Sequence, residues 1–264
     1  MRFTHSRKIE NYFRYFVSMT PYQERVFSEL KLWRIKMKKK ASLSNRLAKK
    51  VQMRINGMIP EKVHKAITFA IEKMVNGVLF GTKFITPKRK ENASFQLREA
   101  YVKKQIIFYQ KTASVEGAVT GAGGIIMGFV DFPAFLTIKM KMLFEIASLY
   151  GFDVKDYKER LFILHIFQLA FSSQEGRNDV FKVIDNWENY SRDLPSDVEQ
   201  FDWRTFQQEY RDYIDLAKMA QLIPVIGAAV GAIANYQLVK LLGKTAMNCY
   251  RMRLIDRGEW ENVP

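Results

Sequence analysis

Two stretches without charged residues, each with small residues at helical spacing, most constrain how this chain can fold. Residues 117–130 carry one glycine stripe, formed by Gly117, Gly121, Gly124 and Gly128. Residues 219–239 repeat the pattern, with Gly227 and Gly231 at its centre. Each glycine inside a helix costs about 0.5–1 kcal/mol relative to alanine, so a stripe of them needs a compensating gain. Close backbone approach supplies that gain, and we predict that the two segments form a tightly packed central helix pair.

Neither stretch makes a convincing membrane span. A spanning helix needs about 20 predominantly apolar residues. The first stretch is shorter than that, and the second contains Pro224, Gln221, Asn235 and Gln237. We expect a hairpin buried in a helical bundle. A shallow or re-entrant membrane contact and a true span remain as alternatives.

The rest of the chain also has helical periodicity, with no strand alternation and no repeat, which predicts an all-α, multi-helix bundle. Pro60 begins one helix, which Gly77 and Gly81 end. The other expected helices cover residues 21–40, 43–56, 94–113, 132–150, 155–172, 177–190, 203–221 and 224–256. In the 94–113 helix, one stripe comprises Leu97, Tyr101, Gln105 and Phe108. We expect a poorly ordered extension at 1–20, a basic amphipathic helical arm at 21–56 and an all-helical domain at 57–264.

Positive charge is concentrated at the start of the chain. The whole chain has a net charge of +15, yet residues 1–54 alone hold 15 Lys and Arg residues against three acids. Such a segment suits an anionic partner, either a phospholipid surface, a nucleic acid or an acidic protein face. The single cysteine, Cys249, excludes an intramolecular disulfide and zinc sites built on cysteine pairs.

Residues 21–40 have the pattern of a basic amphipathic helix. Val26, Leu30, Trp33 and Met37 recur four and three residues apart, and lysines occupy much of the remainder. We predict that an anionic membrane surface or a protein partner is contacted by Lys31, Trp33, Lys36, Lys38, Lys39 and Lys40. Nucleic acid is not the expected partner, because no recognised binding motif accompanies the helix. A merely solvated basic face is the remaining alternative.

Several ordered motifs resemble the EcsC family. They are T-A-S-V-E-G-A-V-T-G-A-G-G at 112–124, G-F-V-D-F-P at 128–133, A-S-L-Y-G-F-D at 147–153 and P-V-I-G-A-A-V-G-A-I-A-N-Y at 224–236. The resemblance covers roughly residues 20–264. It implies a gene beside those for an ABC-transporter ATPase and its membrane subunit, and therefore a place at the cytoplasmic face of a membrane. It supplies no catalytic residues.

The alternative is an enzyme. Glu116 opens the first glycine stripe, and a buried carboxylate there could transfer protons or bind a ligand. His165 lies among apolar residues and could join Glu116 or Glu175 in a metal-dependent hydrolase site. The structural interpretation is that Glu116 begins a helix or pairs with a cation, and that His165 is a core histidine. No metalloprotease or phosphate-loop motif is present, and we expect no cofactor, no metal and a non-catalytic accessory protein.

Overall fold

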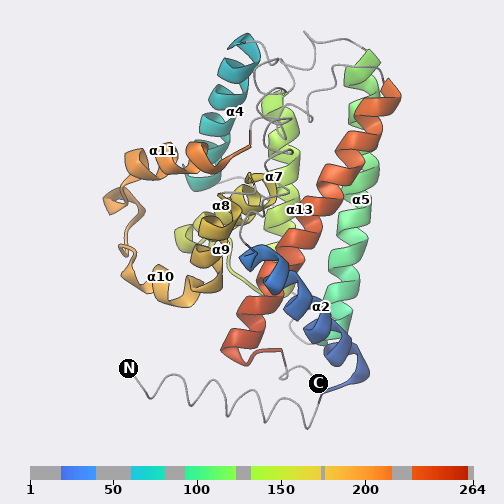
Figure 1. The fold of residues 1–264 in the computed structure, drawn as a ribbon, viewed down its shortest axis with the longest axis vertical. Coiled ribbons are helices and arrows are strands. Elements are labelled where there is room, and N and C mark those ends of the chain that lie inside the picture. Colours follow the sequence, from blue (N-terminus) through green and yellow to red (C-terminus); the bar gives the residue numbers. More distant parts are fainter. Residues whose placement is uncertain are drawn as a thin grey trace. The chain divides into compact units, whose positions relative to one another are not determined.

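The computed structural model describes residues 19–39, 61–80, 93–122, 132–173, 176–215 and 228–260 (Figure 1). Every regular element within these ranges is helical, apart from an isolated β-bridge between Ser172 and Ile214. The prediction of an all-α bundle is therefore confirmed. The chain divides into two compact units, residues 1–38 and 39–264, and each is described by itself.

The described part of the first unit is helix α2 (Pro21–Lys38) with the residues before it. Thr20 begins the helix as predicted. Its hydroxyl accepts a hydrogen bond from the Gln23 backbone N–H at 3.3 Å, and the Gln23 side chain accepts one from the Thr20 N–H at 2.8 Å. This reciprocal arrangement is a capping box, which satisfies two backbone donors that the helix start would otherwise leave unpaired.

The second unit is built around two long helices, α5 (Phe95–Ala122) and α13 (Ala228–Arg257), which run antiparallel along its length (Figure 1). Among the described elements, these two share the most extensive contact. The two helices include parts of the two predicted segments, and the packing of the glycine stripes on each other stays a prediction. Gly117 and Gly121 lie in α5 and Gly231 in α13, whereas Gly124, Gly128 and Gly227 lie outside the described residues.

A close contact in this pair lies at Gly243, a glycine outside the predicted stripes. A Cβ atom placed on Gly243 of α13 would come within 2.7 Å of the Ile106 side chain on α5. Real Cβ atoms do not approach neighbours so closely, so a side chain at this position would require the Ile106 side chain or the helix backbones to shift. Gly243 stands between Leu242 and Lys244, without the repeated spacing that pointed to the other glycines.

Helix α5 differs from the expectation in length and in its buried side. It continues through Ala113 into the glycine stripe, where two helices were expected. The stripe Leu97, Tyr101, Gln105 and Phe108 is not its core side, because Leu97 and Phe108 are exposed while Val102, Ile106 and Ala113 are buried. Contact with α13 and α7 determines which side of α5 is buried. Because both sides of α5 carry apolar residues, the sequence alone does not identify the buried side.

The core lies between this pair and two further helices, α7 (Phe132–Tyr150) and α8 (Tyr157–Phe171). Residues 161–171 of α8 are buried on every side, as expected for a helix at the centre of a bundle. Gly151 ends α7 as predicted, with φ of 98°, a left-handed conformation that favours glycine. Asp156 then starts α8 by accepting a hydrogen bond from the Lys158 backbone N–H at 2.9 Å.

Shorter helices complete the unit. They are α4 (Glu61–Phe80), α9 (Arg177–Asp185), α10 (Trp187–Asp193), the single 3₁₀ turn η1 (Val198–Gln200) and α11 (Trp203–Tyr213). The expected helix at 177–190 is divided at Asn186 into α9 and α10, and α4 passes through Gly77 to end at Phe80. Helix α11 ends at Tyr213, where Ile214 forms the bridge with Ser172, so the predicted continuation to residue 221 is wrong for 214 and 215.

Other predictions lie outside the described residues. These are residues 1–18 of the expected extension, Lys40, the 43–56 helix and the segment around Pro224. Among the described residues, no helix combines the length and the apolar character needed to cross a bilayer.

Candidate functional site

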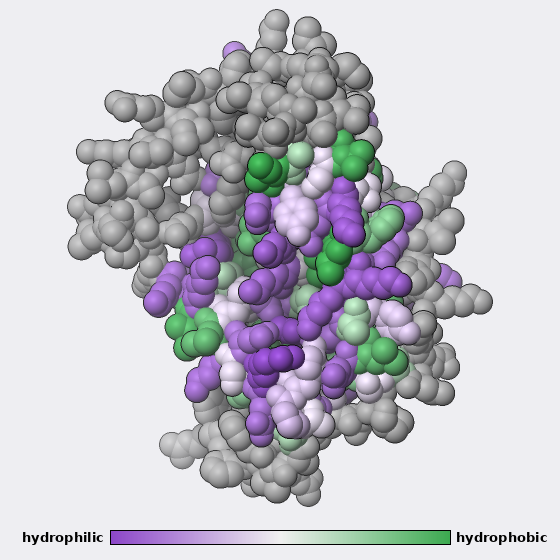
Figure 2. Space-filling view, turned by 90° about the vertical axis from the view of Figure 1, so that its right-hand side faces the viewer, coloured by the Kyte–Doolittle hydropathy of each residue, from purple (hydrophilic) through white to green (hydrophobic). Residues whose placement is uncertain are grey.

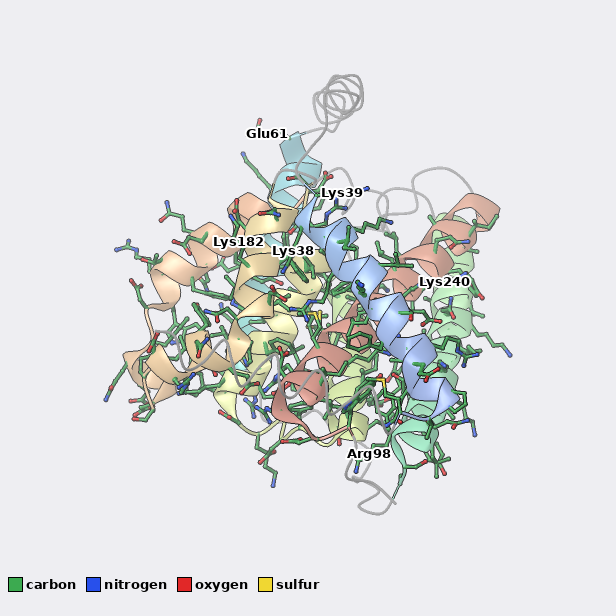
Figure 3. The ribbon with its side chains drawn as sticks, turned by 60° about the horizontal axis from the view of Figure 1, so that its bottom comes forward. Lys38, Lys39, Glu61, Arg98, Lys182 and Lys240 are labelled. Carbon is green, nitrogen blue, oxygen red and sulfur yellow. The ribbon has the colours of Figure 1, made fainter. Side chains whose placement is uncertain are left out.

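Helix α2 presents lysines and apolar side chains together on its exposed side. Lys31, Lys36 and Lys38 are exposed, as is Lys39 directly after the helix (Figure 3 labels Lys38 and Lys39). Leu32 and Ile35, 69% and 49% exposed, lie between them. Residues three and four apart share a side of a helix, so Ile35 neighbours Lys31, Lys38 and Lys39. This exposed side of α2 is the candidate docking face.

Trp33 does not belong to the docking face. It is half-buried and follows Leu30 and precedes Met37 at helical spacing, and both of those residues are buried. The aromatic ring of Trp33 suggested it as the apolar contact, and the structure shows Leu32 and Ile35 as exposed apolar residues on the lysine side. The alternation of Leu32 and Ile35 with lysines is present in the sequence. It was overlooked because the apolar stripe from Val26 to Met37 is the stronger pattern.

His165 is a core residue of α8. Its Nδ1 lies 3.2 Å from the Gln168 side-chain oxygen, and the rings of Trp187, Tyr190 and Phe206 surround it with centroids 5.6–5.9 Å away. Burial lowers the pKa of His165 to about 4, so the imidazole is neutral at physiological pH. These neighbours are aromatic rings and an amide, which are not the carboxylate ligands that the hydrolase alternative requires.

Glu116 is part of α5, but its side chain lies outside the described structure. Glu175, the other carboxylate considered for a site with His165, lies outside the described residues altogether. Within the described ranges, no group of three or more His, Cys, Asp and Glu residues is placed to bind a metal ion. No described contact therefore supports the metal-dependent hydrolase alternative.

Two other buried carboxylates, which the sequence analysis did not single out, are held in ion pairs. Glu99 on α5 accepts two hydrogen bonds from Arg251 on α13, at 2.6 and 2.7 Å. It also accepts one from the Tyr150 hydroxyl at 2.9 Å. The two-point contact matches the planar guanidinium to the carboxylate, which makes such pairs strong and specific in geometry.

The second buried carboxylate is Glu159 on α8. One of its oxygens accepts a hydrogen bond from Arg253 at 2.6 Å and the other from the Tyr250 hydroxyl at 2.7 Å. Burial raises the pKa of Glu159, and the Arg253 charge and hydrogen bond oppose that rise. Arg253 also stacks over Phe152 and Phe162, 4.1 and 4.4 Å from the ring centroids.

These pairs have a structural role. Both oxygens of each carboxylate accept a hydrogen bond from an arginine or a tyrosine, so a metal or a substrate would have to compete with these partners. Each pair also joins α13 to another helix, Glu99 from α5 and Glu159 from α8. Sequence reasoning missed them because the partners are separated by 152 and 94 residues, and nothing local marks Glu99 or Glu159 as buried.

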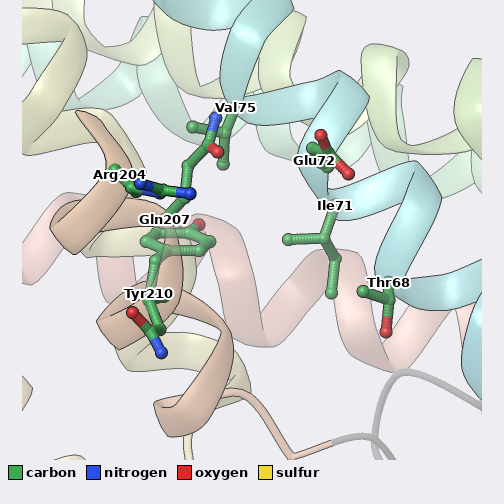
Figure 4. Close-up of a pocket in the computed structure, with 8 residues that line it drawn as sticks. Thr68, Ile71, Glu72, Val75, Arg204, Gln207 and Tyr210 are labelled. Atoms are coloured by element: carbon green, nitrogen blue, oxygen red, sulfur yellow. The ribbon is translucent and has the colours of Figure 1, made fainter.

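A groove between α4 and α11 has a volume of about 650 Å³ (Figure 4). Glu72 on α4 and Arg204 on α11 lie on its two walls, and Ile71 and Val75 supply apolar surface. Gln207 donates a hydrogen bond to Asn76 at 2.9 Å and ties the two helices together. The groove could bind a small polar ligand. Its one strongly perturbed group is Tyr210, whose pKa burial raises and whose hydroxyl donates to the Leu164 carbonyl.

Comparison with known proteins places the chain clearly. A model of the EcsC protein family matches residues 24–255. Protein EcsC of Bacillus subtilis (strain 168) is 48% identical over 230 residues, which cover 87% of this chain and 94% of that protein. The uncharacterized protein YdbA of the same organism is 33% identical over 145 residues, 54% of this chain and 53% of that protein. No solved structure matches. The chain belongs to the EcsC family.

Proposed function

We propose that the protein is a non-catalytic accessory protein, which docks on the cytoplasmic face of a membrane beside an ABC transporter. The observation that carries the proposal is the docking face of α2, where Lys31, Lys36, Lys38 and Lys39 flank the exposed Leu32 and Ile35. Each lysine near an anionic bilayer contributes about 1 kcal/mol of attraction, and the apolar side chains add burial at the head-group boundary.

The surroundings of the buried carboxylates and of His165 in the second unit support a role without catalysis. Glu99 and Glu159 are both engaged by arginines, and the neutral His165 is surrounded by aromatic rings. The proposed association with transporter subunits rests on the EcsC family, whose genes lie beside those for an ABC-transporter ATPase and membrane subunit. The ATPase and the membrane subunit are the protein partners to look for.

Sedimentation with lipid vesicles tests the membrane part of the proposal. The full chain is expected to bind vesicles containing phosphatidylglycerol and to leave vesicles of phosphatidylcholine alone. Replacing Lys31, Lys36, Lys38 and Lys39 by Gln should weaken binding strongly, because attraction is lost at each position. A control that replaces the exposed Lys65, Lys155, Lys182 and Lys141 by Gln removes the same charge outside α2. Equal loss in both variants would show a general charge effect and contradict docking through α2.

A pull-down tests the transporter part. Tagged protein from detergent-solubilised membranes should carry the ATPase or the membrane subunit with it, and the α2 variant should carry less of either. Capture of neither subunit, from cells in which both are detected, would contradict the association.

A further inference from the structure

Positive charge predominates on the outward side of the α5–α13 pair, although Asp256 near the end of α13 is exposed. Residues 100–115 of α5 and 228–255 of α13 contain no Asp or Glu, and Glu116 is the first acid after the α5 segment. Four lysines are exposed there: Lys104, Lys111, Lys240 and Lys244 (Figure 3 labels Lys240). Lys103 is half-exposed and lies 4.0 Å from the buried Glu99. An anionic partner is the electrostatic complement of such a surface.

Exposed apolar side chains alternate with these lysines. On α5, Phe108 and Val115 lie at three- and four-residue steps from Lys104 and Lys111, so all four share a stripe. Seven large apolar side chains on the two helices are 37–65% exposed, namely Leu97, Ile107, Phe108, Val115, Ile233, Tyr236 and Leu241. Figure 2 shows hydrophobic residues scattered among hydrophilic ones on this side of the molecule. Apolar side chains scattered singly are ordinary on a protein surface, but here they share helical stripes with lysines, which is the pattern of a surface that meets a lipid head-group layer.

The charges also have a direction along the pair. Because α5 and α13 are antiparallel, the end of α5 and the beginning of α13 lie at the same end of the unit (Figure 1). Residues 117–122 and 228–239, which form that end, carry no charge; the first charged residues below it are Glu116 and then Lys111 on α5, and Lys240 on α13. Uncharged helix ends followed by a band of lysines are typical of surfaces that meet a bilayer, where lysine stems lie along apolar surface and the amines reach the head groups.

We propose that this outward side, named here the α5–α13 face, is a second surface that contacts an anionic lipid bilayer. The proposal rests on the proposed membrane docking but concerns a different unit from α2. A protein partner fits less well, because lysine is depleted from the centres of protein interfaces. Nucleic acid fits less well too, because the exposed aliphatic side chains would have no partner in the phosphate backbone.

Vesicle binding combined with a local probe tests the α5–α13 face. A first variant replaces Lys104, Lys111, Lys240 and Lys244 by Gln, and the control replaces Lys65, Lys155, Lys182 and Lys141 by Gln. We expect the first variant to bind phosphatidylglycerol vesicles at least tenfold more weakly than the control, because each lysine near the surface contributes up to about fivefold in affinity. All eight lysines are exposed, so both variants should fold, and circular dichroism confirms this before binding is measured.

The local probe is a fluorophore on Phe108→Cys, compared with the same label on Lys182→Cys. Cys249 is fully buried and should not react. Lipids that carry a quencher should quench the label at 108 and leave the label at 182 bright. Loss of affinity together with quenching at 108 would support the α5–α13 face. Unchanged affinity, or a bright label at 108 on vesicle-bound protein, would overturn it.

The α2 variant separates this inference from the proposed function. If replacing the α2 lysines abolishes binding while the α5–α13 variant binds normally, docking through α2 stands and the second face is wrong. If only the α5–α13 variant loses binding, the second face stands and docking through α2 is wrong. Normal binding by both variants, or sequestration by RNA or protein in place of vesicles, would contradict both.

Discussion

One half of the α5–α13 pair contains buried, paired charges, and the other half contains exposed lysines. In one half, Glu99 and Arg251 are buried and bonded to each other across the helix interface. In the other half, Lys111 and Lys240 are exposed on helices whose neighbouring residues include no acid before Glu116. A buried charge without a partner strongly destabilises a fold. Glu99 and Arg251 are buried, and each is the partner of the other. An exposed charge costs little, so an excess of one sign on the other half is available for binding.

The largest predicted effect is on the buried half. Glu99→Gln keeps the shape of the side chain but leaves Arg251, 5% exposed, without its countercharge. We expect the free energy of unfolding to fall by about 3–5 kcal/mol in urea denaturation at neutral pH. Glu61→Gln is the matched control, because its pair with Lys65 is on the surface, and it should change nothing measurable. Similar stabilities for the two variants would remove the distinction between buried and exposed pairs.

The second prediction concerns pH. The pKa of His165 is about 4 in the fold and about 6.5 in an unfolded chain, so the unfolded chain binds more protons between these values. This contribution to stability is complete above pH 6.5 and is lost as the pH falls towards 4. The loss should amount to about 3 kcal/mol in the free energy of unfolding. His165→Gln should flatten this part of the profile, and an unchanged slope in the variant would show that His165 is not its source.

The third prediction tests how closely the helix pair packs. Gly243→Ala places a methyl group against Ile106 and should cost about 1–3 kcal/mol in the free energy of unfolding. Gly77→Ala adds the same methyl group where no atom lies within 4 Å, and should gain up to about 1 kcal/mol from helix propensity. Opposite signs in thermal unfolding are expected. If Gly243→Ala is neutral or stabilising, Ile106 or the two helices can shift at little energetic cost, and the contact is less tight than described.

The smallest predicted effect on stability is that of the exposed lysines. Replacing Lys104, Lys111, Lys240 and Lys244 by Gln removes like charges that face solvent, so the free energy of unfolding should stay unchanged or rise slightly. The melting temperature measured without vesicles checks this. A clear loss of stability would show that these lysines support the fold, and the contrast between the two halves would fail.

Much of the fold could be predicted from the sequence because its signals are local. Thr20 begins α2 and Gly151 ends α7 through their own backbone preferences, and periodicity locates most of the helices. The prediction that the stripe with Leu97 and Phe108 faces the core was wrong, because α5 has apolar residues on two sides. Only contact with α13 decides which of these sides is buried.

The candidate site was less predictable for the same reason. Spacing identified the lysines of α2 but assigned the apolar contact to Trp33, where the structure exposes Leu32 and Ile35. The sequence pointed to Glu116 because this residue stands beside a glycine. The buried carboxylates Glu99 and Glu159 instead pair with arginines from α13, which lie far along the chain. Pairing of that kind is a property of the tertiary structure and has no local signature.

The most direct test of the central claim, that the protein is held on a membrane surface by exposed lysines, is fractionation of cells with a salt wash. At about 1 M salt the screening length falls to about 3 Å, which weakens attraction between exposed charges. We predict that the protein sediments with membranes at low salt and moves to the supernatant after the high-salt wash. Protein found only in the supernatant at low salt, or retained in membranes after the wash, would contradict the account.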